Sequence, residues 1–201
     1  SWVVFESGPF GATYAHALGI RPHVDRANPI LALIGSPTEL TKLQSDRLES
    51  QSGVDLITVD DPASDVSQLL SRLRASAEVG KTVIGIRTTS RDGSAPDPLH
   101  ASQMLTLIID LAVECADSMQ LDGIYASGGD VAFAVLDALG ARGYEVENEV
   151  VPLAVSGKLV GGPHDGLGFA TKGGLVGDAD AAVECINQLR SRIRQSEPRI
   201  V

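Results

Sequence analysis

Short apolar runs of strand length alternate with helical patterns along this chain, and this alternation restricts the fold more than any other feature. The apolar runs lie at residues 30–34, 56–59, 81–86 and 123–127. The helical patterns follow them at residues 38–50, 64–78, 99–119 and 131–139. Apolar strands separated by helices favour a parallel sheet that is covered on both faces. The sequence therefore predicts an α/β fold: a three-layer helix–sheet–helix domain with a mostly parallel or mixed sheet.

Outside this regular part, a short strand at residues 2–5 and a helix at residues 10–18 are expected near the start of the chain. The polar, proline-containing segment at residues 88–98 is too long for a tight turn, so we expect a mobile loop there. The 201 residues suit a single domain, 1–201, with a sizeable core. Because the chain begins without Met, it is plausible as a piece of a longer protein.

Charge and composition exclude several partners. The net charge of −10 is spread along the chain, which argues against nucleic acid, because nucleic-acid binding depends on clustered Lys and Arg. No apolar run approaches the roughly 18 residues that a membrane span needs, so no membrane contact is expected. Cys115 and Cys185 lie in helical patterns without metal-ligand neighbours, and we expect buried thiols in a reducing cytoplasm.

The segment from residue 161 to residue 178 is unusually rich in glycine, with seven glycines in eighteen residues. An apolar strand at residues 167–170 leads into Lys172, Gly173 and Gly174, and a helical pattern opens at Asp178. A glycine-lined turn between a strand and a helix is suited to hold an anion, since its N–H groups carry partial positive charge. Lys172 could add a full charge. The alternative is a wide surface loop with glycines at its tight turns.

Two further turns have a similar composition. Ser36 follows the strand at residues 30–34, and either its hydroxyl or that of Thr38 could meet a ligand, although Thr38 could be an ordinary N-cap. The other turn contains Gly128, Gly129 and Asp130; Asp130 could cap the helix that begins at Val131 or reach a ribose or Mg²⁺. If the strands are parallel, all three turns meet at one edge of the sheet, where ligands of such folds bind. The sequence thus predicts a site for a phosphorylated ligand.

Familiar motifs for such a site are missing. The chain contains neither a G-x-x-x-x-G-K-[ST] loop nor a G-x-G-x-x-G turn between a strand and a helix, and it lacks protein-kinase signatures. Its four histidines have no ligand-like spacing with Cys or Glu, so no metal site made by the protein is expected. His164, inside the glycine-rich segment, is the histidine worth testing, and loop decoration is the alternative.

Three segments together carry a family resemblance. They are Ser127–Gly128–Gly129–Asp130, residues 157–166 (G-K-L-V-G-G-P-H-D-G) and residues 171–178 (T-K-G-G-L-V-G-D). In order and spacing they resemble the C-terminal nucleotide-binding domain of the four-carbon acid sugar kinase family. Residues 7–10 and 35–41 also look like that family, so the resemblance covers nearly the whole chain.

The resemblance implies ATP-dependent phosphorylation of a sugar acid such as threonate or erythronate, with Mg²⁺. By position, the residues implied to contact nucleotide are Ser36, Gly128, Gly129, Asp130, Val131, Gly173 and Gly174, with Lys172 near the phosphates on electrostatic grounds. The family's D-D-[FL]-T-G-A signature, which binds the sugar acid on an N-terminal domain, does not occur in this sequence. The catalytic residue is therefore unassigned, and the fragment is expected to be inactive alone.

This sequence also departs from the family at Gly173 and Leu175, where many members carry Ser and Asn. Two other functions remain open: a non-catalytic module that senses a nucleotide or phosphate, and part of an enzyme acting on a phosphosugar. A homo-oligomer is possible.

Overall fold

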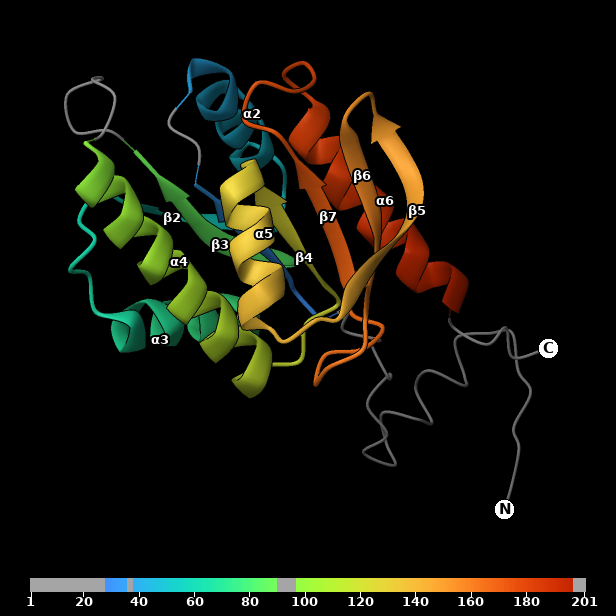
Figure 1. Cartoon of the computed structure of the whole chain (residues 1–201), viewed down its shortest axis with the longest axis horizontal. Coiled ribbons are helices and arrows are strands. Elements are labelled where there is room, and N and C mark those ends of the chain that lie inside the picture. Colours follow the sequence, from blue (N-terminus) through green and yellow to red (C-terminus); the bar gives the residue numbers. More distant parts are fainter. Residues whose placement is uncertain (1–27, 36–37, 90–96, 197–201) are drawn as a thin grey trace, which may run out of the picture.

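The computed structural model describes residues 28–35, 38–89 and 97–196. Within these ranges the chain forms one seven-stranded sheet and five helices (Figure 1). The strands are β1 (Ile30–Ile34), β2 (Val54–Val59), β3 (Val83–Thr88), β4 (Gly123–Ser127), β5 (Gly143–Val151), β6 (Ala154–Val160) and β7 (Gly168–Lys172). The helices are α2 (Glu39–Glu49), α3 (Val66–Glu78), α4 (Pro98–Ser118), α5 (Gly129–Ala138) and α6 (Ala181–Ser196).

The sheet is mostly parallel, as predicted. Its strand order is β2-β3-β1-β4-β7-β6-β5, in which the first five strands pair in parallel, and β6 pairs antiparallel with both of its neighbours, β7 and β5. The expected three-layer α/β fold is confirmed. The predicted strand at residues 2–5, the predicted helix at residues 10–18, Ser36 and residues 90–96 of the predicted loop lie outside the described residues.

Alternate residues of the buried strands supply two separate apolar cores. Leu31 and Leu33 of β1 pack in the cluster that contains residues of α3, α4 and α5. Ile30 and Ile34 pack instead in the cluster that contains residues of α2 and α6. The side-chain period of two in a strand causes this division. Both faces of β1 are therefore covered, which explains why its sequence is continuously apolar.

Helix α4 is the longest of the five helices in the described part of the chain. Asp97 caps it by accepting hydrogen bonds from the Leu99 and His100 N–H groups at 2.8 and 3.1 Å. By length and composition alone α4 could cross a membrane. Its buried residues, however, form a stripe at helical spacing against the sheet: Met104, Leu107, Ile108, Leu111, Ala112 and Cys115. We therefore interpret α4 as a core helix of the domain, as its sequence pattern predicted.

The hairpin of β5 and β6 was not predicted from the sequence. β5 lies at the edge of the sheet, and most of its residues are exposed, so it has no continuous apolar run. It carries Glu145, Glu147 and Glu149, and its register against β6 shifts twice. Lys158 lies 3.2 Å from the Glu145 carboxylate and Arg192 lies 2.8 Å from that of Glu147. Charges and irregular register at an edge disfavour pairing with another chain.

The helix starts follow local side-chain chemistry. Thr38 caps α2, as predicted, by accepting a hydrogen bond from the Thr41 N–H group at 3.1 Å. The last predicted helix begins at Ala181 rather than at Asp178. The Asp178 carboxylate accepts a hydrogen bond from the Asp180 N–H group at 3.0 Å. This short side-chain turn delays the helix, because it competes with helical backbone pairing.

Candidate functional site

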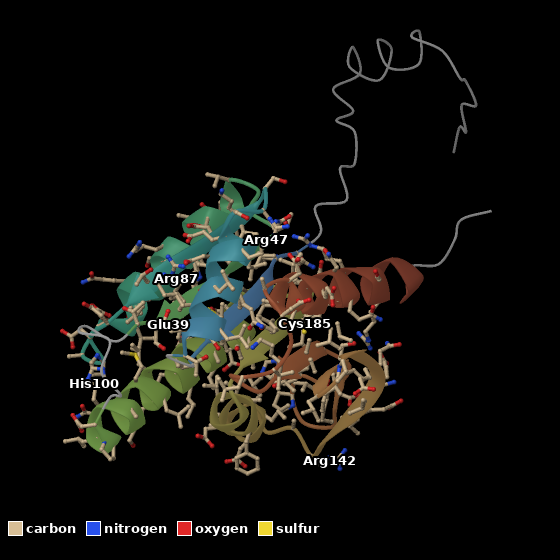
Figure 2. All side chains as sticks on the ribbon, turned by 90° about the horizontal axis from the view of Figure 1, so that it is seen from above. Glu39, Arg47, Arg87, His100, Arg142 and Cys185 are labelled. Carbon is tan, nitrogen blue, oxygen red and sulfur yellow. The ribbon has the colours of Figure 1, made fainter. Side chains whose placement is uncertain are left out.

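Three turns lie together at the carboxyl edge of the parallel strands. β4 lies between β1 and β7 in the sheet, so the turns that follow these strands are neighbours. The Gly35 N–H group donates to the Ser127 carbonyl at 3.2 Å, and the Gly128 N–H group donates to the Lys172 carbonyl at 2.9 Å. Figure 2 views the molecule from this edge, with α4 and α5 along one side and α6 on the other. The predicted convergence is therefore confirmed for Gly35, Gly128 and Gly173, the described residues that directly follow the three strands.

The edge between β1 and β4 is also a point where the chain reverses direction. The connection through α2 leads from β1 toward β2 at one edge, whereas α5 leads from β4 toward β5 at the opposite edge. The two connecting helices contribute to different core clusters, on opposite faces of the sheet. Open α/β sheets bind ligands at such a reversal, beyond the carboxyl ends of the strands.

The glycine-rich segment does not form one continuous site. Residues 161–167 precede β7, and the turn that contains Gly173 and Gly174 follows it, so about 16 Å of strand separates them. Gly162 has φ +77°, and a Cβ there would lie 2.2 Å from the Gly140 carbonyl oxygen. Glycine is thus required for packing in the first half. The wide-loop interpretation holds for residues 161–167, and only the second half lies beside the other two turns.

His164 also belongs to that opposite edge. Its Nε2 lies 3.2 Å from a carboxylate oxygen of Asp117, near the end of α4. The Gly161 N–H group donates to the Asp165 carboxylate at 2.5 Å, which fixes the same loop. These contacts bind the loop to the domain and place His164 away from the three turns. His164 is therefore a surface-loop residue, which is the alternative to a ligand-binding role.

Helix α5 begins without a side-chain cap. Its N-cap is Gly128, with φ 116° and no side-chain hydrogen bond. The interpretation of Asp130 as the cap is wrong, because Asp130 lies in the first turn of α5 and is exposed. In α2, α3 and α4 the caps Thr38, Asp65 and Asp97 accept backbone hydrogen bonds. The first N–H groups of a helix have no partner inside it, and at the start of α5 no capping side chain accepts from them.

Gly129 sits at the start of α5 without a structural need for glycine. A Cβ placed there would meet no atom within 4 Å, and its φ is not positive. Gly128, by contrast, needs its left-handed backbone. Gly173 is intermediate, because an added Cβ would lie 3.1 Å from Val176 Cγ2. The space above Gly129 is therefore open, and backbone there is accessible to a ligand.

Side chains of α2 hold the turn after β7, which the sequence analysis missed. The Thr38 and Thr41 hydroxyls both lie 2.9 Å from the Gly174 carbonyl oxygen. Gln44 Nε2 donates to the carbonyls of Val176 at 3.0 Å and Asp178 at 2.6 Å. We call the side chains of Thr38, Thr41 and Gln44 the α2 clamp. Thr41 and Gln44 are buried polar residues on the inward face of an amphipathic helix, and polar residues at such positions are the signal that could have revealed them.

The Lys172 side chain is buried beneath the turns rather than exposed at the edge of the sheet. It is 2% exposed, and its Nζ donates to the Gly173 carbonyl at 3.0 Å. Burial lowers the pKa of this ammonium group. Burial raises the pKa of Cys185 to about 12, so its thiol is protonated. Both cysteines are free and buried, as predicted.

A cavity opens on the α4 side of the turns. Its volume is about 370 Å³. It is lined by Gly35 after β1, by Thr88 and Thr89 at and just after the end of β3, and by Asp130 and Val131 at the start of α5. The first three turns of α4 form the remaining wall, including His100, which is labelled in Figure 2. The cavity therefore touches two of the three turns.

Comparison with known proteins identifies the domain. The family described as "Nucleotide-binding C-terminal domain" matches residues 31–182, which include all three turns. A D-erythronate kinase from Heliobacterium modesticaldum is 35% identical over 219 residues, covering 96% of this chain and 49% of that protein. The chain belongs to the C-terminal nucleotide-binding domain family of the four-carbon acid sugar kinases.

Other relatives of this sugar-acid kinase domain agree in sequence and fold. A D-threonate kinase from Salmonella typhimurium is 27% identical over 173 residues, covering 74% of this chain and 40% of that protein. A Bordetella bronchiseptica structure, described as a domain of unknown function with bound citrate and a domain-swapped dimer, is 26% identical with a TM-score of 0.70. That match covers 82% of this chain and 41% of the other. The chain thus spans about half the length of the curated relatives it matches.

Proposed function

We propose that this chain is the ATP-binding part of a cytoplasmic kinase that phosphorylates a four-carbon sugar acid of the threonate or erythronate type. The observation that carries the proposal is the start of α5. It is uncapped, it has open space above Gly129, and it lies beside two other turns at the reversal point of the sheet. A helix N-terminus of this kind favours a phosphate group. The family membership and the names of the relatives supply the class of reaction.

In this proposal different turns contact different phosphates of the nucleotide. The N–H groups of Gly129, Asp130 and Val131 face one phosphate, and the turn of Gly173 and Gly174 faces another. Ser36 would add a hydroxyl. Lys172, buried beneath the Gly173 carbonyl, contributes positive potential from below rather than a direct contact. Phosphoryl transfer depends mainly on positioning and on neutralising charge, and backbone donors of this kind serve both needs.

Mg²⁺ would accompany the nucleotide. Among the described residues, no group of three or more His, Cys, Asp or Glu side chains is placed to hold a metal ion. Mg²⁺ in nucleotide sites is held mostly by substrate phosphates, water and one or two carboxylates. Asp130, exposed at the start of α5, is the carboxylate of this turn that fits that role. Bound Mg²⁺ would neutralise charge that develops on the transferred phosphate.

The acceptor site belongs, in this proposal, to the other half of the kinase. The relatives are about twice as long as the part that this chain matches. The acidic signature that binds the sugar acid in the family does not occur in this sequence. Positioning both reactants supplies much of the acceleration of such a reaction. This chain alone should therefore bind nucleotide without phosphorylating threonate or erythronate.

Calorimetry tests the binding part of this proposal. ATP with Mg²⁺ should bind more tightly than AMP, because the proposed contacts are made to phosphates. Equal affinities, or no binding of ATP at millimolar concentration, would refute it. ATP consumption should then be assayed with threonate and erythronate isomers, with and without the N-terminal half of a relative. Turnover by this chain alone would place the acceptor site here, and binding without turnover in either case would favour a sensing module.

A further inference from the structure

Helix α4 leaves much of its apolar surface uncovered by the domain. Its most apolar 18-residue window is only 33% buried, because the buried stripe against the sheet accounts for one side of the helix. Leu105, Ile109 and Val113 form a second apolar stripe at helical spacing, and all three are only partly buried. Leu105 lines the cavity beside α5, so this second stripe lies on the α5 side of α4.

Helix α5 extends the same apolar surface. Phe133 is 74% exposed, which is unusual for a large aromatic side chain. Ala134 and Ala138 lie three and seven positions after Val131, which lines the cavity beside α4, so they share that side of the helix. Figures 1 and 2 show α4 and α5 side by side on the outside of the domain. The α4–α5 strip is formed by Leu105, Ile109, Val113, Phe133, Ala134 and Ala138.

Carboxylates flank the α4–α5 strip, and the two helices contribute no positively charged Lys or Arg. On α4, Asp110 and Glu114 are exposed, and on α5, Asp130 and Asp137 are exposed. In the described part of the chain, none of these four carboxylates forms an ion pair. A positively charged partner with an apolar face would therefore find complementary charge on both sides of the strip.

The same charges disfavour other occupants of the strip. A second copy would bring like carboxylates together from two chains that each carry a net charge of −10. Helices that lie on anionic lipid surfaces carry Lys and Arg on their polar face, and α4 and α5 carry neither. The three turns open at the end of the sheet, whereas the strip runs along the outside of the helix layer. A domain that meets the turns need not cover the strip.

We propose that the α4–α5 strip is a docking site for an amphipathic helix of a partner protein, with Lys or Arg beside its apolar face. Such helices place apolar residues three or four positions apart into a groove. Phe133 packs against that apolar face, and the small Ala134 and Ala138 leave room for its larger side chains. The Lys or Arg residues of the partner pair with Asp110 and Asp137.

A synthetic peptide tests this chemistry. It has about 18 residues, or about five helical turns, with Leu on one face and Lys on the other, and fluorescence anisotropy reports its binding. Phe133→Lys should weaken peptide affinity at least about tenfold, because an aromatic anchor is lost and a like charge is added. The matched control is Val79→Lys, which adds the same charge at a residue that is 77% exposed at the end of α3. It should change affinity less than about twofold.

A second pair of variants tests the flanking charge. Asp137→Asn should weaken peptide affinity by about threefold and reduce its salt dependence, because one exposed ion pair is lost. Glu78→Gln removes an exposed carboxylate at the end of α3 instead, and it should leave both quantities unchanged. A peptide of the same composition without helical periodicity should bind weakly and equally to all variants.

Thermal unfolding should show that the variants are folded, and Phe133→Ser serves in place of Phe133→Lys if the latter fails to fold. Unchanged peptide affinity in the Phe133 variant would overturn the proposal. Equal losses in Phe133→Lys and Val79→Lys would also overturn it, because net charge alone would then explain binding.

Three further results would give the strip a different occupant and overturn the proposal. A dimer in light scattering that Phe133→Lys separates would assign the strip to a second copy. Binding to lipid vesicles that the same variant abolishes would assign it to a membrane surface. Loss of peptide binding when the N-terminal half of a relative is added would assign it to that half.

Discussion

Replacing Gln44 by Leu tests whether α2 positions the turn after β7. Gln44 is 1% exposed, and its Nε2 donates to the carbonyls of Val176 at 3.0 Å and Asp178 at 2.6 Å. Leu has a similar volume and preserves the packing of α2 while removing both hydrogen bonds. The substitution therefore tests the two hydrogen bonds of the clamp without altering the packing of α2.

The expected loss of stability is small. Each of the two hydrogen bonds contributes about 1 kcal/mol net, so the loss is about 2 kcal/mol. Gln44 Oε1 is buried without a partner among the described residues, and removing such an atom returns about 1 kcal/mol or more. The free energy of unfolding should fall by about 1 kcal/mol. Urea denaturation, followed by circular dichroism, measures it.

The expected loss of ATP affinity is larger. Without the two hydrogen bonds, the turn must be ordered when the nucleotide binds, so up to about 2 kcal/mol of binding free energy is lost. That corresponds to about a 30-fold weaker affinity, measurable by calorimetry. Val176 and Asp178 are not buried, so water can satisfy their carbonyls when the nucleotide is absent.

Gln51→Leu is the matched control. Gln51 follows the other end of α2, and its amide contacts the Arg47 carbonyl of the same helix at 3.4 Å. Neither stability nor ATP affinity should change measurably. Wild-type ATP affinity in Gln44→Leu, with the predicted loss of stability, would show that the turn after β7 does not contact the nucleotide or does not need the clamp.

Two further predictions concern the same edge. Gly129→Val should weaken ATP binding at least tenfold, about 1.4 kcal/mol. The unfolding temperature should stay nearly constant, because an added Cβ meets no atom within 4 Å in the free protein. Wild-type ATP affinity in this variant would show that the turn is purely structural. Burial lowers the pKa of Lys172 below its ordinary 10.5, so the unfolded chain binds this proton more tightly and stability should rise with pH through the window just below 10.5. Lys172→Met should lack this contribution, and an identical pH dependence in urea denaturation of both proteins would contradict it.

The sequence alone determined the layers of the fold and the position of the three turns. β1 is apolar at every residue because helices cover both of its faces, and this made it recognisable without a structure. Thr38 was recognisable as a cap because capping depends on neighbouring residues. The convergence of the turns followed from parallel pairing, which strands alternating with helices favour. Local pattern was sufficient for each of these.

Other features could not be predicted from local sequence pattern, because they depend on tertiary contacts. The β5–β6 hairpin was missed because an edge strand with exposed glutamates lacks a periodic apolar signal. Glycines are frequent both at residues 161–167 and at residues 173–177. Gly161 and Gly162 nevertheless lie against the Arg142 side chain and the Gly140 backbone, whereas the second group lies at the opposite end of β7.

The α2 clamp joins residues more than 130 positions apart in the chain, and the cavity joins four separate elements. Contacts of this kind depend on which strands become neighbours in the sheet. Lys172 shows the same limit: its charge suggested a phosphate contact, and the pleat of β7 turned its side chain beneath the turn instead. Local sequence pattern indicates which segments form strands, and only the packed sheet decides where the strands end and what their side chains meet.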